Sequence, residues 1–170
     1  MKAVYITEQG PIDKLTWGER PEPHPGQGEV VVRVRATALN HLDLFARSGE
    51  NAVSTGGFPR ILGCDMAGEV ADVAPGVSQI KPGQRVLVNY EVKCGSCDYC
   101  VIGRDEYCRR RVRLGVDADG GYAEYCKVPA SCIYPISDSI SCEEAAAVPL
   151  VFHTAWHCLV TRAGLQPGED

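Results

Sequence analysis

Four of the nine cysteines lie within one stretch of fifteen residues, and this cluster constrains the fold more than any other feature of the sequence. Cys94, Cys97, Cys100 and Cys108 have the spacing C-x2-C-x2-C-x7-C. Four thiolates complete the tetrahedral coordination of zinc and leave no position open for water, so the spacing predicts a structural zinc site. The segment around them is too polar to fold by burying its own side chains, and metal binding can supply that free energy.

Three other interpretations of the cluster stay open at this point. Four cysteines also hold iron–sulfur clusters, although this spacing departs from the common ferredoxin runs. Two disulfides would require an oxidising compartment. A nucleic-acid zinc finger would use the basic run of Arg109, Arg110, Arg111 and Arg113, but one short basic run in an acidic chain is usually a solvated loop.

Charge and hydropathy exclude several classes of partner. The formal net charge of -5 argues against nucleic acid and against an anionic membrane surface. No run of 18 apolar residues occurs, so we expect no membrane span. The opening MKAVYITEQGP does not match a secretory signal, and nine cysteines cannot all pair. These observations together favour a cytoplasmic protein.

The first 135 residues predict mostly β-structure. The alternation in 29–38 (EVVVRVRATA) is typical of a strand with one buried face. The prolines of 19–28 make that segment a surface connector. Strands are expected at 2–7, 29–38, 66–73, 85–90, 121–128 and 132–136.

Helices are expected at two places. Asn40 opens a short helix with Asp43 three residues on, much as in a capping box, and Gly49 ends it before a polar loop at 50–60. Near residue 138 the character changes: 141–144 (SCEE) is a capping box, and Pro149 restarts the helix. Residues 150–161 then predict an apolar helix that ends at Gly164, before a turn at 166–170.

Several motifs agree with the cysteine cluster in order and spacing. They are MKAV, PHPGQGEVVVRVRA, NHLD, FPRILGCDMAGEV, VAPGV, KPGQRV and GGYAEYCKVP. Together they resemble the medium-chain dehydrogenase/reductase superfamily, which contains the zinc alcohol dehydrogenases and their quinone-reductase-like relatives. The resemblance extends over essentially all 170 residues.

The resemblance implies a mainly β fold: a GroES-like, partly open β-barrel with a zinc-binding loop lobe, and C-terminal helices that lead towards an absent Rossmann domain. It divides the chain into a GroES-like catalytic domain at 1–137, with the zinc lobe at about 91–113, and linking helices at 138–170 that begin a truncated nucleotide-binding domain. No G-x-G-x-x-G motif occurs to hold a pyrophosphate. We therefore expect a fragment of a longer NAD(P)H-dependent enzyme that does not transfer hydride alone.

The catalytic metal site of the alcohol dehydrogenases is where the sequence departs from its relatives. Asn40 stands at the position of the first Cys ligand, Cys64 at that of the His, and Asp65 at that of the adjacent Glu. Leu150 stands where the last Cys is expected. The Asn40 pattern is similar to that of quinone and enoyl reductases, which pass hydride from NADPH to a quinone or an activated double bond without a Lewis acid.

That resemblance makes a small-molecule reductase our first hypothesis. The alternative within the same class is an alcohol dehydrogenase with an atypical catalytic metal site. A hypothesis of another class is a free-standing, zinc-stabilised binding module. Relatives are often dimers or tetramers, and an apolar cleft side would permit self-association, so a homo-oligomer is possible.

Each cleft residue has more than one interpretation. Asn40 is either a plain helix cap or a substrate contact, and Asp43 caps too, although in relatives it supports the metal-binding His. Cys64 is a buried small hydrophobe, a ligand in an altered metal site or a reactive thiol. Asp65, at an apolar strand entry, should be paired or functional.

Residues outside the cleft motif complete the set of candidates. The resemblance implies that His41 contacts the cofactor pyrophosphate and that Thr154 lies beside the nicotinamide. His153 and His157 share a helix face and either chelate a metal or are polar residues of a linking helix, and a new site from Cys64, Asp65 and His153 is also open. The remaining cysteines are expected to be buried packing thiols: Cys126, Cys132, Cys142 and Cys158.

Overall fold

The alternating segment Glu29–Ala38 forms β3, an interior strand of the larger sheet between β5 and β9. A computed structural model of the chain describes residues 1–53 and 55–169. Ser54, within the loop predicted at 50–60, and Asp170, within the predicted C-terminal turn, lie outside the described residues. Val30, Val31 and Val32 are all buried, and exposed and half-buried residues alternate only from Arg33 onwards, so the predicted alternation is present in part.

The larger sheet has five antiparallel strands among the described residues, in the order β10-β6-β5-β3-β9. Its other strands are β5 (Asp65–Val73), β6 (Arg85–Val88), β9 (Tyr125–Pro129) and β10 (Ile133–Pro135). The smaller sheet, in the order β2-β1-β4, consists of β1 (Lys2–Ile6), β2 (Thr16–Glu19) and β4 (Arg60–Ile61). β7 (Glu91–Val92) and β8 (Val112–Arg113) form a separate pair.

The segment 121–124 joins the five-stranded sheet and the three-stranded sheet without being a strand itself. Val4 N donates to Tyr122 O at 2.7 Å, whereas Val34 N donates to Glu124 O at 2.9 Å. The strand predicted at 121–128 therefore begins only at Tyr125, because the residues before it bond to two different strands rather than to one ladder. The sheets form no closed barrel in the described part of the chain.

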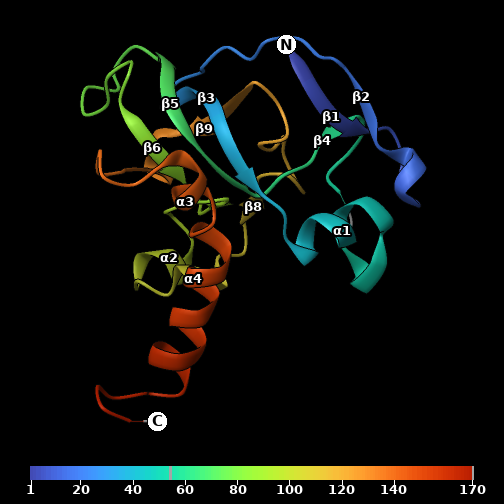
Figure 1. Cartoon of the computed structure of the whole chain (residues 1–170). Coiled ribbons are helices and arrows are strands. Elements are labelled where there is room, and N and C mark those ends of the chain that lie inside the picture. Colours follow the sequence, from blue (N-terminus) through green and yellow to red (C-terminus); the bar gives the residue numbers. More distant parts are fainter. Residues whose placement is uncertain (54, 170) are drawn as a thin grey trace.

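Helices connect the sheets and extend from them. The α-helices are α1 (His41–Ser48), α2 (Asp98–Val101), α3 (Cys142–Ala146) and α4 (Pro149–Trp156). Short 3-10 turns are η1 (Ile12–Lys14), η2 (Glu50–Ala52), η3 (Asp105–Tyr107) and η4 (Ala130–Cys132), and the π-helical η5 (His157–Arg162) continues α4. Figure 1 shows α4 running away from the sheets, with the C-terminus beyond its far end.

Both predicted capping boxes lie at helix starts. Asn40 N donates to Asp43 Oδ2 at 2.8 Å, and α1 ends at Gly49, whose φ of 81° is left-handed. Ser141 N donates to Glu144 Oε2 at 2.8 Å, and Glu144 N donates back to Ser141 Oγ at 3.1 Å. Pro149 is the first residue of α4, so the predicted restart of the helix is confirmed.

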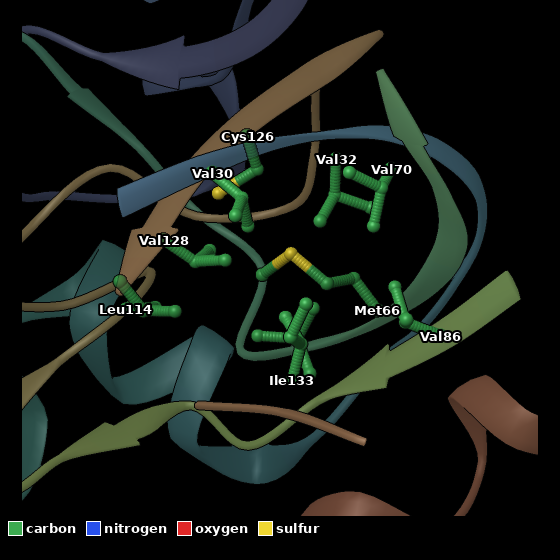
Figure 2. Packing of buried hydrophobic residues seen from close by; sticks show 10 residues of the cluster. Val30, Val32, Met66, Val70, Val86, Leu114, Cys126, Val128 and Ile133 are labelled. Atoms are coloured by element: carbon green, nitrogen blue, oxygen red, sulfur yellow. The ribbon is translucent and has the colours of Figure 1, made fainter. Parts of the chain in front are cut away.

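The main core lies on the inner face of the five-stranded sheet. In Figure 2 the Met66 side chain runs through the middle of the cluster, with its sulfur among the surrounding valines. The buried members are Val30, Val32, Met66, Val70, Val86, Val88, Leu114, Cys126, Val128 and Ile133. Six of these ten are valines, which is consistent with β-branched side chains packing well on a pleated surface.

Two smaller clusters of buried side chains position the helices α1, α3 and α4. Ile6, Ala46, Leu62, Cys64 and Val116 pack together beneath α1, with Leu150 against them. Ala67, Ala145 and Ala146 pack α3 closely on β5. Because small side chains let the helix approach the sheet, the start of α4 is carried to the beginning of β5.

The apolar helix predicted at 150–161 exists, but its side chains are largely exposed. Val151, Phe152, Trp156 and Leu159 all have exposed side chains. Cys158 is exposed and Cys142 half-buried, so the prediction of buried packing thiols is wrong for Cys158 and correct for Cys126 and Cys132. In the described part of the chain, no helix combines the length and apolarity that a membrane crossing needs.

Candidate functional site

The four clustered cysteines come together at one end of the molecule. The sulfur of Cys100 lies 3.5 Å from that of Cys97 and 3.9 Å from that of Cys94, and all four ligand atoms lie within 4.8 Å of one another. Four sulfurs bound tetrahedrally to zinc, at about 2.3 Å each, would lie about 3.8 Å apart. The arrangement therefore fits a single zinc ion.

The same distances decide between the alternatives for this cluster. The sulfurs are much farther apart than the roughly 2.05 Å of a disulfide, and all nine cysteines are free. They are also too close together to enclose a cluster of several irons. The arginine run is neutralised locally, since Arg109 pairs with Asp98 at 3.1 Å and Arg113 with Asp117 at 2.8 Å, which favours the solvated-loop interpretation over a nucleic-acid surface.

Backbone amides favour the thiolate form of two of the cysteines. The backbone at Ser96 lowers the pKa of Cys94 to about 5. The backbone amides of Cys100 and Arg109 lower the pKa of Cys97. Burial raises the pKa of Cys100 to about 12, so the backbone favours the metal-binding thiolate form at only two of the four cysteines.

The lobe is attached to the barrel through a buried acid. Glu91, on β7, is 9% exposed and accepts from Arg111 Nη1 at 3.0 Å and from Lys93 Nζ. The β7–β8 pair closes the lobe at its base, with Glu91 opposite Arg113. Sequence reasoning did not single out Glu91, because an isolated acid in a polar segment gives no periodic signal.

A second polar cluster, the cleft cluster of Asn40, Asp43, Cys64, Asp65 and Leu150, lies where α1, β5 and α4 begin. Asp65 is 1% exposed, and its two oxygens accept from different segments. Asn40 Nδ2 donates to Oδ2 at 3.0 Å, and the backbone N of Leu150 donates to Oδ1 at 3.0 Å. The prediction that Asp65 is paired or functional is met by this pairing.

Asp43 organises the other side of the cleft cluster. It is 2% exposed and accepts from Asn40 N at 2.8 Å and from Cys64 N at 3.0 Å. The carboxylate thus fixes the turn into α1 and the turn into β5 together. The capping interpretation of Asn40 and Asp43 is confirmed, and contact of Asn40 with a substrate stays a prediction.

Cys64 is fully buried among apolar side chains. Burial raises the pKa of its thiol far above the ordinary value, and the charge of Asp43 raises it further. A thiol that stays protonated is a poor nucleophile and a poor ligand. The buried-hydrophobe interpretation of Cys64 is therefore favoured over the reactive thiol.

These residues do not fit a catalytic zinc. Leu150 offers no side-chain ligand, and the amide nitrogen of Asn40 is bonded to Asp65. Within the described residues the four cysteines are the only group of three or more His, Cys, Asp or Glu side chains close enough to share an ion, so Cys64, Asp65 and His153 form no such group.

The two predicted cofactor-binding residues lie outside the cleft cluster. His41 is exposed at the start of α1, and its ring lies 6.0 Å from that of Phe45. Thr154 is exposed on α4. With His153 and His157 it lines a cavity of about 240 Å³ between α4 and the cysteine lobe, where Arg162 Nη1 also donates to Tyr107 Oη at 3.0 Å.

Two tyrosines near the cleft cluster were not predicted. Tyr90 and Tyr122 both pack against the Cys64 cluster. Burial raises the pKa of each hydroxyl above its ordinary value; the charge of Glu91 raises the pKa of Tyr90 further, and that of Asp43 raises the pKa of Tyr122 further. Tyr90 lies outside the sequence motifs and Tyr122 lies within GGYAEYCKVP, but only the tertiary structure places both beside Cys64.

Comparison with known proteins shows what the chain is similar to. Residues 26–138 match the family model of the alcohol dehydrogenase GroES-like domain. An alcohol dehydrogenase of Geobacillus stearothermophilus is 38% identical over 152 residues, which are 89% of this chain and 44% of that protein. An acryloyl-coenzyme A reductase of Metallosphaera sedula is 33% identical over 169 residues, 99% of this chain and 49% of that protein.

Solved structures agree with these relatives. The crystal structure of an NAD-dependent alcohol dehydrogenase superposes with a TM-score of 0.94 at 41% identity, over 100% of this chain and 49% of that one. The cobalt- and zinc-bound thermostable alcohol dehydrogenase from Pyrobaculum aerophilum gives 0.91 at 34% identity, over 99% and 50%. The chain spans about half the length of the curated relatives it matches, and the expected mainly β, GroES-like fold is confirmed.

Proposed function

Because the chain belongs to the alcohol dehydrogenase GroES-like domain family of the medium-chain dehydrogenase/reductase superfamily, we propose that it is part of a zinc-containing NAD(P)-dependent oxidoreductase. In this proposal residues 1–137 are the catalytic domain and 138–170 lead into a nucleotide-binding domain. Cys94, Cys97, Cys100 and Cys108 hold one structural zinc. The need for reduced thiols at that site favours the cytoplasm.

The substrate we propose is an activated double bond, as in an α,β-unsaturated carbonyl compound, or a quinone. The observation that supports it is the pairing of Asp65 with Asn40 and Leu150, which leaves the cleft cluster polar but without a metal-ligand set. The Metallosphaera relative, named an acryloyl-coenzyme A reductase, acts on a substrate of this class by its name.

The chemistry needs little from the protein beyond binding and charge stabilisation. NAD(P)H, when bound, would supply the hydride that adds to the β-carbon, and the substrate's carbonyl oxygen would take up the negative charge. A hydrogen-bond donor at that oxygen stabilises the charge as it develops. Asn40 has one amide hydrogen on Asp65, and the structure gives its second hydrogen no partner among the described residues, so it is our candidate donor. The α-carbon takes its proton from water.

The remaining site residues have supporting roles in this proposal. Asp43 holds Asn40 and Cys64 in place through its two hydrogen bonds. His41 and Thr154, exposed on α1 and α4, are our candidates for cofactor contact. Exposed apolar side chains on α4 give a surface for association of copies of the chain, which light scattering would test.

The proposal is tested first on the gene. A glycine-rich strand–turn–helix encoded downstream of residue 170 supports the enzyme, whereas a stop codon there favours a zinc-stabilised binding module. The protein encoded by the whole gene is then assayed for NADPH and NADH oxidation with acryloyl-coenzyme A, simple enones and quinones, and for reduction of NAD(P)+ with alcohols. Zinc per chain is measured on the same preparation.

The two enzyme classes give different results. About one zinc per chain with reduction of the enone or quinone supports our proposal. About two zinc ions per chain with oxidation of alcohols would overturn it in favour of an alcohol dehydrogenase with an atypical metal site. Because some of the relatives are named alcohol dehydrogenases, the second outcome is the main alternative to our proposal.

A further inference from the structure

Asp65 joins three parts of the chain that are far apart in sequence. It is the first residue of β5, whereas Asn40 lies before α1 and Leu150 lies in the first turn of α4. The two hydrogen bonds, both 3.0 Å long, span 25 and 85 residues. Because Asp65 is only 1% exposed, water does not compete strongly for either bond.

The bond to Leu150 replaces a missing helix cap. The residue before α4 is Val148, whose side chain cannot accept a hydrogen bond, and Pro149 has no backbone donor. The N–H of Leu150 is therefore a free donor of the first turn, and such donors need an outside acceptor. Asp65 supplies that acceptor from another element, and a carboxylate there also interacts well with the helix dipole.

The bond to Asn40 sets the orientation of a side-chain amide. A carboxylate only accepts hydrogen bonds, so it selects the amide nitrogen of Asn40 and not the amide oxygen. One of the two N–H groups is then fixed on Asp65 and the second is directed away from it by the planar geometry of the amide. Asn40 is only half-buried, so part of this residue can be reached from solvent.

We propose that Asp65 is a positioning residue, which holds the Asn40 amide with its free N–H ready for a substrate carbonyl and fixes the start of α4 beside it. The part of this inference that concerns substrate rests on the reductase function proposed above. The part that concerns geometry stands on the two hydrogen bonds alone. Asp65 acts through Asn40 and does not itself touch the substrate.

Because Asp65 is buried, its pKa depends on its neighbours. Burial raises the pKa of Asp65, the bonds from Asn40 and Leu150 lower it, and the charge of Asp43 raises it. Cys64, Tyr90 and Tyr122 are the other titratable groups whose charges interact with Asp65 or with one another there. Loss of either hydrogen bond would therefore raise the pKa of Asp65.

The geometric part is tested by nuclear magnetic resonance on the zinc-loaded 170-residue chain. In Asp65→Asn only one side-chain oxygen remains to accept from two donors, so we expect at least one of the two protected protons, the Leu150 backbone amide or the Asn40 side-chain proton, to exchange at least tenfold faster. The matched control is Asp72→Asn, the same substitution at an exposed position of β5. Unchanged exchange in Asp65→Asn would overturn the inference.

The functional part is tested by a double-mutant cycle in the protein encoded by the whole gene, with acryloyl-coenzyme A as the probe. If Asp65 acts through Asn40, Asn40→Ala and Asp65→Asn each lower kcat/KM about 10- to 100-fold, and the double variant loses no more than the worse single one. Losses that multiply would show that Asp65 has only a general structural role. Asp72→Asn should leave kcat/KM unchanged.

The two proposals fail in different ways. Inactivity of the wild-type protein on every unsaturated substrate, with the Asp65-dependent protection intact, removes the reductase and leaves the geometry standing. Loss of the protection effect removes the positioning role whatever the activity. Should Asp65→Asn not fold, Asn40→Ala serves in its place, because it keeps the bond to Leu150 and removes the amide alone.

Discussion

The carboxylate of Glu91 lies 3.0 Å from Nη1 of Arg111, and this ion pair joins the two ends of the cysteine lobe. Glu91 also pairs with Lys93, so one buried acid holds two cations at the base of the lobe. A lobe with so few buried apolar side chains depends on such bonds as well as on its metal.

Glu91→Gln should destabilise the folded chain by about 1–3 kcal/mol, because it leaves two partly buried cations without their acid. Urea unfolding of the zinc-loaded protein measures this, and the lobe should also lose zinc to a chelator faster. Asp98→Asn is the matched control, since its pair with Arg109 is exposed on both sides and should change stability by no more than about 0.5 kcal/mol. Equal effects of the two substitutions would contradict the role of Glu91 in stabilising the cysteine lobe.

Much of the fold follows from local sequence patterns. The alternation over 29–38 and the capping signals at Asn40, Ser141 and Pro149 predict elements within one or two residues, because each depends on neighbours along the chain. The cysteine spacing likewise predicts the sulfur arrangement, since turns of a few residues bring the ligands together.

The cleft cluster depends on contacts between distant segments. The resemblance identifies Asn40, Cys64 and Asp65 as cleft positions, but the bond from Leu150 to Asp65 spans 85 residues and involves a backbone N–H that no side-chain pattern marks. The sequence does not predict the exposure of Cys158 for a similar reason: an apolar helix is buried only when another part of the protein covers it.

Met66→Ala should cost about 2–5 kcal/mol, because the side chain occupies the centre of the main core and its removal leaves a cavity (Figure 2). Met66→Leu, which nearly conserves volume, should cost less than about 1.5 kcal/mol. Thermal and urea unfolding of the two variants gives the comparison. A small effect of the alanine would mean that the sheets collapse to fill the space.

Gly63→Ala should cost about 2–5 kcal/mol, because a side chain is strained at φ +98° and its Cβ would lie 2.8 Å from the backbone N of Tyr122. Gly76→Ala separates the two causes: its φ of +90° is similar, but nothing lies within 4 Å of the added Cβ. We expect about 1 kcal/mol there. If the two variants unfold at the same urea concentration, close packing at Gly63 is not the reason for the glycine.

Asp65 should make the chain less stable as the pH rises. Burial raises the pKa of Asp65 in the folded state above its ordinary value of 3.8. At pH values between the ordinary pKa and the raised pKa, the folded chain therefore binds more protons than the unfolded chain. The free energy of unfolding contributed by this group therefore falls as pH increases through that window and stays lower above it. Asp65→Asn lacks this term. The difference in unfolding free energy between the variant and the wild type, measured by urea titration from pH 4.5 to 7.5, should shift in favour of the variant as pH rises, and a constant difference would contradict the assignment.

The cysteines should react with a thiol reagent in three separate groups. Cys158 is exposed and Cys142 half-buried, so both should react within minutes in the zinc-loaded native chain. Burial raises the pKa of Cys126 to about 12 and that of Cys64 further, so these two and the buried Cys132 should react only on unfolding. The four lobe cysteines should become reactive when a chelator removes the metal.

Colour development with a disulfide reagent should thus show two thiols at first, six after chelation and nine in denaturant, with mass spectrometry to locate each label. Cys158→Ser should remove one of the first two without changing the rest. Rapid labelling of Cys64 in the native chain would mean that the cleft opens to solvent, and the reactive-thiol interpretation would then replace the buried one.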